Sequence, residues 1–375
     1  MTNEIQKVHE LGQSLWYDNI HRELLNDGTL AGMIESGEIR GVTSNPSIFN
    51  QAISQSDVYN QAIQDLTKAG KSRDEIYEAL AVDDIQRAAD LFRPLYDQTQ
   101  GGDGYVSLEV SPYLAHDTEG TIEEAKRLWK LVDRPNLMVK IPATLEGLPA
   151  ITEAIASGIN INVTLIFGLG RYRAVREAYL KGLVKRLDEG ESISDIASVA
   201  SFFISRIDSK VDDRLSEMVE AGGDGAETAG DLLGKIAIAS GKLAYRDYRR
   251  TFSPDHQIYQ KIKEASGNLQ RVLWASTSTK NPAYSDVRYV EEMIGPDTVN
   301  TVPHKTLDAF RDHGKAALTI DQGVQEAEKQ FQQLSELGIE IDTVTQELED
   351  EGVKSFADSF TSLLKTIEER KESFS

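Results

Sequence analysis

The sequence predicts an α/β protein built on a (β/α)₈ TIM barrel with additional helices, including a C-terminal helical extension. Two observations lead to this fold class: eight short apolar or β-branched runs recur along the chain, and stretches of helical periodicity separate them. Strands that alternate with helices pair in parallel through right-handed crossovers, and eight such units are enough to close a barrel. An open, doubly wound sheet is the alternative that the same pattern allows.

The expected strands are nearly continuous in apolar residues, as is typical of strands buried on both faces. They lie at Leu15–Ile20, Gly41–Ser44, Tyr105–Val110, Leu137–Pro142, Ile161–Phe167, Ala197–Ile204, Arg271–Thr277 and Thr298–Val302.

Amphipathic helices are expected in the intervals between these strands. They lie at Ser72–Tyr96, at Thr121–Val132 with its Thr-Ile-Glu-Glu opening, at Tyr172–Asp188 and in an Ala-rich stretch at Ala226–Tyr248.

The simplest domain organisation is a single domain over residues 1–375, with barrel strands at about 15–302. The interval 207–269 is too long for a minimal βα unit, so we expect additional helices there. Residues 321–369 are predicted to form two more helices outside the barrel.

Composition narrows the class of protein. A hydrophobic content of 40% with 27% charged residues is ordinary for a globular protein with a sizeable core. The N-terminus has no apolar signal region, and no stretch approaches the roughly 18 uninterrupted apolar residues of a membrane span. Zero cysteines exclude disulfides, thiolate nucleophiles and Cys-ligated zinc. We therefore expect a cytoplasmic protein that does not bind membranes, as a monomer or a homodimer.

The formal net charge of −21 argues against a nucleic-acid-binding surface, because neutralising phosphates requires clustered Lys and Arg. If the substrate were a phosphate ester, the overall field would repel it. A local basic patch would then be needed at the site.

Lys140 is the most informative single residue. It lies in the run Asn-Leu-Met-Val-Lys-Ile-Pro-Ala-Thr (136–144), which reads as a buried strand with one cation in place of an apolar side chain. Burial disfavours the ammonium form of lysine, and a neutral amine can attack a carbonyl carbon to form a Schiff base. The structural alternative is that Lys140 closes an edge strand and extends to solvent.

Polar residues gather where the expected strands end, which is where TIM barrels place their active sites. Taken singly, each has a structural alternative; Asp18, for example, could be a helix N-cap and Asn45 a turn residue before Pro46. Glu109 is harder to explain in that way, because an unpaired buried carboxylate costs several kcal/mol. The strand-end candidates are Asp18, Asn19, Thr43, Ser44, Asn45, Glu109, Lys140, Asn162, Thr164, Ser201, Arg206, Ser276, Ser278 and Lys280.

No motif indicates a metal or a cofactor. The six histidines lack metal-ligand spacing, and Gly168-Leu169-Gly170 lacks the third glycine of a dinucleotide fingerprint. A phosphate-binding P-loop and a nucleophile elbow are also missing from the sequence. We expect lysine and carboxylate chemistry with no cofactor and no metal.

Several of these segments together resemble the transaldolases of the longer bacterial type, within the class I Schiff-base aldolases. The resemblance covers most of the chain. It rests on the runs 15–18 (Leu-Trp-Tyr-Asp), 41–49 (Gly-Val-Thr-Ser-Asn-Pro-Ser-Ile-Phe), 106–110, 136–144, 161–167 and 201–206.

The resemblance implies transfer of a dihydroxyacetone unit from fructose 6-phosphate or sedoheptulose 7-phosphate to glyceraldehyde 3-phosphate or erythrose 4-phosphate. The pathway would be the non-oxidative pentose phosphate branch. By resemblance, Lys140 forms the Schiff base, Glu109 and Thr164 hold a catalytic water, and Asp18 exchanges a proton with the C4 hydroxyl.

The resemblance also implies a substrate-binding shell. Asn45 and Asn162 would bind the dihydroxyacetone hydroxyls, with Thr43 and Ser201 completing the shell. Arg206 matches the family's phosphate-binding arginine. After strand seven, many relatives have Ser-Phe-Arg, whereas this chain reads Ala-Ser-Thr-Ser-Thr-Lys-Asn-Pro over 275–282. There Ser276 and Lys280 would contact the phosphate, although Lys280 lacks the bidentate fork of arginine.

Three other functions are compatible with a barrel. The nearest is a fructose-6-phosphate aldolase that releases free dihydroxyacetone, a related group of much shorter chains without a Glu at the position of Glu109. A non-catalytic scaffold would leave the strand-end polar groups unexplained. A bifunctional sugar-phosphate enzyme would need a second full domain, for which the chain is too short.

Overall fold

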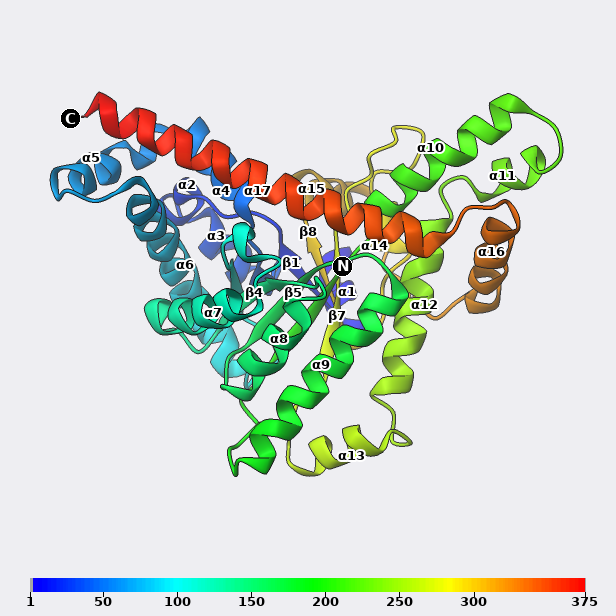
Figure 1. The fold of residues 1–375 in the computed structure, drawn as a ribbon, viewed down its shortest axis with the longest axis horizontal. Coiled ribbons are helices and arrows are strands. Elements are labelled where there is room, and N and C mark those ends of the chain that lie inside the picture. Colours follow the sequence, from blue (N-terminus) through cyan, green and yellow to red (C-terminus); the bar gives the residue numbers. More distant parts are fainter. Residues whose placement is uncertain (1–2, 375) are drawn as a thin grey trace.

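The computed structural model describes residues 3–374, which form a closed barrel of eight parallel strands in the order β1 to β8 (Figure 1). The barrel closes where β1 pairs with β8, from Gln13 beside Thr298 to Tyr17 beside Val302. The predicted fold class is therefore confirmed, and the open doubly wound sheet is wrong. The strands are β1 Gln13–Tyr17, β2 Gly41–Val42, β3 Tyr105–Glu109, β4 Leu137–Pro142, β5 Ile161–Ile166, β6 Ser198–Phe203, β7 Gln270–Ala275 and β8 Thr298–Val302.

Helices surround the barrel and extend beyond it. They are α1 Glu4–Glu10, α2 Arg22–Asn26, α3 Thr29–Glu35, α4 Pro46–Gln55, α5 Asn60–Lys68, α6 Arg73–Gln98, α7 Thr118–Val132, α8 Gly147–Ala156, α9 Leu169–Asp188, α10 Ser205–Ala221, α11 Ala226–Leu232, α12 Ile236–Thr251, α13 Gln257–Glu264, α14 Arg288–Glu291, α15 His304–His313, α16 Val324–Glu336 and α17 Ile341–Ser373, with short 3₁₀ turns η1 Asp57–Tyr59 and η2 Pro112–Leu114.

The first two strands differ most from the prediction. β1 begins at Gln13, before the predicted start, because the buried Gln13 amide donates to Met293 O at 2.7 Å and to Thr298 Oγ1 at 2.9 Å. These bonds let a polar residue occupy a buried strand position. β1 ends at Tyr17, so Asp18 lies in the loop that follows, and β2 is only two residues long.

Three helix predictions needed correction. α9 begins at Leu169 instead of Tyr172. α7 begins at Thr118 instead of Thr121, because the Asp117 side chain accepts from Gly120 N at 3.0 Å and provides the N-cap. The predicted Ala-rich helix is two helices, α11 and α12. The chain turns between them at Gly234, whose φ of +66° favours glycine, and Asp212 Oδ1 accepts from Gly234 N at 2.8 Å.

The C-terminal helix α17 crosses the end of the barrel where the strands finish (red in Figure 1). As predicted, residues 321–369 contain two helices that are not part of the barrel wall. α17 nevertheless packs closely on the barrel: a Cβ added at its Gly352 would lie 2.9 Å from Leu165 Cδ2 of β5. An ion pair of 3.2 Å between Arg171 and Glu349 also fixes this helix.

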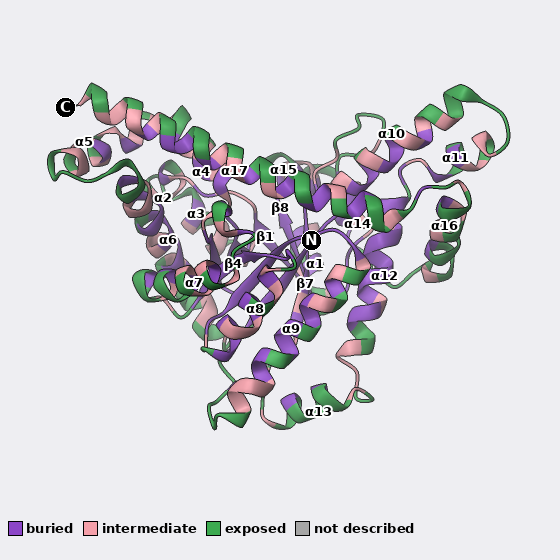
Figure 2. Cartoon of the chain, viewed as in Figure 1, coloured by how far each residue is buried: buried purple, intermediate pink, exposed green. Residues whose placement is uncertain are grey.

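The barrel strands consist almost entirely of buried residues, and the helices around them are buried over part of their surface (Figure 2). The main apolar cluster is continuous and includes residues from Ile5 in α1 to Ile367 in α17. One apolar cluster therefore connects the barrel strands to helices near both ends of the described chain. Within residues 3–374, no helix combines the length and apolar character that a membrane crossing requires.

Candidate active site

A cavity of about 150 Å³ lies at the end of the barrel where the strands finish. Its walls bring together nine of the eleven predicted site residues, from strands and loops far apart in the sequence. The nine are Asp18, Thr43, Asn45, Lys140, Thr164, Ser201, Arg206, Ser276 and Lys280.

Lys140 and Glu109 form the buried centre of the site. They are register partners on the neighbouring strands β4 and β3, and they are only 4% and 9% exposed. Lys140 Nζ lies 3.4 Å from Glu109 Oε2 and donates to Ser44 O at 2.9 Å. Burial raises the pKa of the Glu109 carboxyl, and the nearby charge of Lys140 offsets part of that shift. The edge-strand interpretation of Lys140 is wrong, because β4 pairs on both sides.

Two buried oxygens of the site have unused hydrogen-bonding capacity. Glu109 Oε2 has the ion pair with Lys140 but no other partner, and Thr164 Oγ1 makes no hydrogen bond to any residue in 3–374. Buried polar atoms of this kind usually bind water or a ligand. The two side chains can therefore interact with a molecule that enters the site.

A local irregularity in β5 sets the position of Thr164. The register between β5 and β6 shifts between Val163 and Ile166, and Leu165 has a φ of +58°. A non-glycine residue in this conformation costs about 1–3 kcal/mol and needs support from its surroundings. Close packing between Leu165 and Gly352 of α17 is part of that support.

Asp18 follows β1 and faces the cavity from the loop. Its backbone N donates to Val302 O at 3.0 Å, and its Oδ1 accepts from Thr43 Oγ1 at 2.6 Å. Burial raises the pKa of the Asp18 carboxyl, while the Thr43 hydrogen bond and the charge of Lys140 act in the opposite direction. Asp18 is not a helix N-cap, since His21 occupies that position of α2.

Asn45 has a structural role as well as a place in the cavity wall. Its Oδ1 accepts from Ile48 N at 2.9 Å and caps α4. Because the cap uses only the carbonyl oxygen, the Asn45 amide group remains available as a donor to a ligand.

Asn162 is fully buried and does not line the cavity itself. Its Nδ2 donates to Ser107 Oγ at 3.0 Å, and its Oδ1 accepts from Ser201 Oγ at 2.7 Å. Asn162 thus fixes the orientation of Ser201, which does line the cavity.

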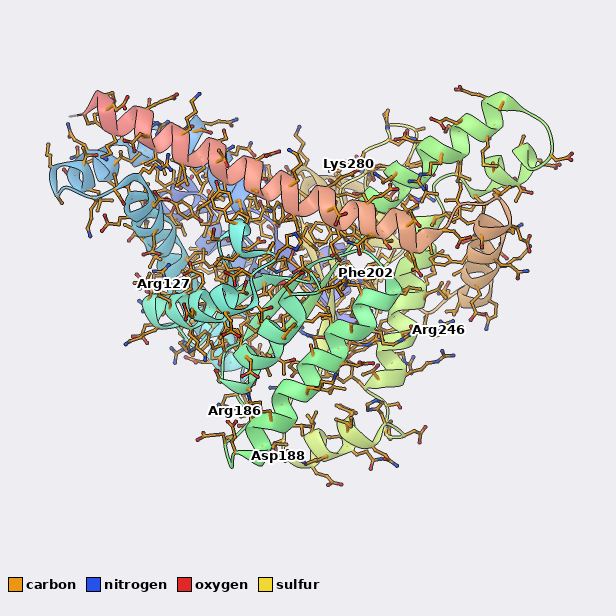
Figure 3. All side chains as sticks on the ribbon, viewed as in Figure 1. Arg127, Arg186, Asp188, Phe202, Arg246 and Lys280 are labelled. Atoms are coloured by element: carbon orange, nitrogen blue, oxygen red, sulfur yellow. The ribbon has the colours of Figure 1, made fainter. Side chains whose placement is uncertain are left out.

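Two cations, Arg206 and Lys280, stand at the cavity. Arg206 lies in the first turn of α10 with its guanidinium 5.3 Å from the centre of the Phe203 ring. Lys280 Nζ donates to Ser278 Oγ at 2.6 Å, and its side chain lies at the end of the barrel that α17 crosses (Figure 3). Burial lowers the pKa of both groups, and the charge of Arg206 lowers that of Lys280 further. Neither forms an ion pair with a carboxylate of the described chain, so both are available to a phosphate.

A buried lysine beside a carboxylate, with two cations nearby, is the arrangement expected of a Schiff-base enzyme that acts on phosphorylated sugars. Residues 15–367 match the family model described as "Transaldolase/Fructose-6-phosphate aldolase". The chain belongs to this family.

Proteins named transaldolase are similar to this chain over nearly their whole length. A transaldolase of Trichodesmium erythraeum is 45% identical, covering 99% of this chain and 98% of its own. Transaldolases of Frankia alni and Thiobacillus denitrificans are each 46% identical, covering 98% and 97% of this chain and 97% and 99% of their own. The resemblance to transaldolases is therefore confirmed.

Sequence reasoning missed several members of this family site. Thr301 lines the cavity and its Oγ1 lies 2.6 Å from Thr43 Oγ1; the inward alternation of β8 could have indicated it. Phe203 and Pro303 are also in the wall. Phe356 of α17 lines the cavity as well, and no local signal could have linked it to residues so far away in the sequence.

Proposed function

We propose that this protein is a transaldolase that moves a dihydroxyacetone unit between sugar phosphates. The ketose donor is sedoheptulose 7-phosphate or fructose 6-phosphate, and the acceptor is glyceraldehyde 3-phosphate or erythrose 4-phosphate. The reaction belongs to the non-oxidative pentose phosphate pathway. The proposal rests on the position of Lys140. This residue is buried with its Nζ 3.4 Å from Glu109 Oε2, and it lines a cavity together with Arg206 and Lys280, neither of which forms an ion pair within residues 3–374.

Lys140 supplies the nucleophile. Its amine attacks the C2 carbonyl of the ketose, and the resulting carbinolamine loses water to form a Schiff base. Breakage of the C3–C4 bond leaves its electrons on the Schiff base as an enamine, while Asp18 accepts the proton of the C4 hydroxyl. The enamine then adds to the acceptor aldehyde, and hydrolysis frees Lys140.

Glu109 and Thr164 assist proton transfer during formation and dehydration of the carbinolamine. The proximity of Glu109 to Nζ and the free hydrogen-bonding capacity of Thr164 Oγ1 support this role. A water held between the two side chains would transfer the protons that carbinolamine formation and dehydration require.

The remaining residues bind and orient the substrate. Asn45, Thr43 and Ser201 are positioned along the cavity for the hydroxyls of the dihydroxyacetone unit, with Asn162 holding Ser201 in place. Arg206, with Lys280 and Ser276, binds the phosphate and forms the basic patch that an acidic protein needs.

Replacing Arg206 by alanine is expected to raise KM for the phosphorylated donor about 10- to 100-fold with a smaller change in kcat. The reason is that a charge-assisted hydrogen bond to phosphate contributes about 1.5–3 kcal/mol. Steady-state kinetics with fructose 6-phosphate measures this, with Arg93→Ala on the outer helix α6 as the control. An unchanged KM would remove Arg206 from the phosphate site.

Replacing Phe356 by alanine is expected to increase release of free dihydroxyacetone relative to transfer, because the ring closes one wall around the Lys140 intermediate. The ratio of release to transfer is measured with fructose 6-phosphate as the donor, with and without erythrose 4-phosphate as the acceptor. Phe360→Ala is a matched control, since Phe360 lies one turn further along α17 and does not line this cavity. The same ratio in both variants would show that Phe356 does not shield the intermediate.

A second candidate function is fructose-6-phosphate aldolase activity, because the family model covers both activities. The names of the relatives and the position of Glu109 favour transfer. An assay without any aldose acceptor separates the two activities. Strong turnover of fructose 6-phosphate in that assay would show that the protein is an aldolase and not a transaldolase.

The setting of this reaction is proposed to be the cytoplasm, where sugar phosphates are produced. The protein is proposed to act as a monomer or a homodimer.

A further inference from the structure

A second cavity lies outside the barrel, between α9, α12 and α13. Its volume is about 1070 Å³, and it shares no lining residue with the Lys140 cavity. Figure 1 shows α9 and α12 diverging along the side of the barrel, with α13 at the end opposite α17. We call this cavity the α9–α13 groove.

The groove is positively charged in an otherwise acidic protein. Six lysines and arginines line it against four aspartates and glutamates, whereas the whole chain carries a formal net charge of −21. A local reversal of charge of this kind attracts anions.

Two arginines of the groove, Arg173 and Arg250, share one carboxylate, that of Asp247, with the neighbouring Arg246. Asp247 is only 8% exposed, and its carboxylate oxygens lie 3.2 Å from Arg246, 3.7 Å from Arg250 and 3.8 Å from Arg173. A single carboxylate cannot neutralise three guanidinium groups, and only Arg246 has a further acidic partner, Glu328. Arg173 and Arg250 therefore retain donors for another anion.

Arg176 provides an independent observation. It lines the groove but is only 2% exposed, and its Nε and Nη1 have no hydrogen-bond partner in residues 3–374. Its guanidinium lies 4.2 Å from the centre of the Tyr172 ring, and this contact satisfies neither Nε nor Nη1. A buried charge without a hydrogen-bonding partner is costly, and a bound anion would offset that cost.

Part of the groove lining is apolar. Leu180 and Val184 of α9 line it together with Ile258 of α13, whose 48% exposure is high for a large aliphatic side chain. The occupant should therefore combine a negative group with an apolar or ring-shaped part.

We infer that the α9–α13 groove is a binding site for a phosphate ester that carries a ring, such as a nucleoside phosphate. Its phosphate binds Arg173, Arg176 and Arg250, and its ring lies against Leu180, Val184 and Ile258. This site is separate from the Lys140 cavity and does not depend on the proposed transaldolase activity.

Isothermal titration calorimetry with AMP tests this inference. The intact protein is expected to bind AMP at the groove, and Arg173→Ala/Arg250→Ala should weaken binding about tenfold or more. Because these two side chains are 63% and 70% exposed, the double variant should fold normally. kcat and KM for sugar phosphates should stay the same. The matched control is Arg87→Ala/Arg93→Ala, which removes two exposed cations from α6 and should leave AMP binding intact.

Three further titrations identify the site and the ligand class. Arg176→Met, which keeps an unbranched side chain, should also weaken AMP binding, whereas Arg206→Ala should not. The inference is overturned if AMP does not bind at millimolar concentration. It is also overturned if only Arg206→Ala reduces binding, which would place AMP in the Lys140 cavity. Inorganic phosphate binding as tightly as AMP would contradict the role of the apolar wall.

Discussion

Replacing Lys140 by alanine is expected to abolish transfer of the dihydroxyacetone unit, lowering kcat by roughly four orders of magnitude or more. Among the described residues, Lys280 is the one other lysine that lines this cavity; it donates to Ser278 Oγ, whereas Lys140 is the lysine paired with Glu109. Without an amine at this point there is no electron sink for breakage of the C3–C4 bond. A coupled assay with fructose 6-phosphate and erythrose 4-phosphate measures the loss.

Two controls separate chemistry from folding. Lys140→Met keeps most of the buried volume and should be equally inactive, while Lys354→Ala changes an exposed lysine of α17 and should be fully active. Circular dichroism establishes that each variant is folded. Appreciable turnover by folded Lys140→Ala or Lys140→Met would refute the role of Lys140.

Replacing Asp18 by asparagine is expected to lower kcat by about 10²–10⁴-fold, because the amide cannot accept the proton of the C4 hydroxyl. Asparagine nearly preserves the shape of the side chain and can still accept the hydrogen bond from Thr43. Single-turnover cleavage of fructose 6-phosphate measures the step, with Asp312→Asn at an exposed site as the control. Unchanged cleavage would exclude Asp18 as the base.

The pH dependence of the same step has a definite sign. Burial raises the pKa of the Asp18 carboxyl, so the group keeps its proton at a higher pH than an ordinary aspartate, whose pKa is about 3.9. Cleavage needs the ionised form and should be lost as the pH falls through this raised pKa. The acid limb of kcat/KM should therefore lie above about pH 4. An acid limb at or below the ordinary carboxyl pKa would contradict this assignment.

The barrel could be predicted because its strands are buried on both faces and therefore read as apolar runs. The same rule failed at Gln13, a polar residue whose buried amide nitrogen donates to Met293 O and Thr298 Oγ1. Helical periodicity also failed to separate α11 from α12, since the break depends on a hydrogen bond from Gly234 to Asp212 on another helix.

The candidate site was predicted where its residues lie at strand ends. Lys140 and Glu109 stood out because a charge in an apolar run requires a partner, and the structure places the two side by side. Phe356 could not be found in this way, because its position depends on how α17 crosses the barrel. The conformation of Leu165 was equally hidden, since it depends on contact with Gly352.

Borohydride reduction in the presence of fructose 6-phosphate, followed by peptide mass spectrometry, tests whether Lys140 forms the Schiff base. We expect a three-carbon adduct on Lys140, since reduction would trap the dihydroxyacetone unit after cleavage has released the aldose. If no lysine of the folded protein carries an adduct, the result would contradict the Schiff-base mechanism and, with it, the proposed function.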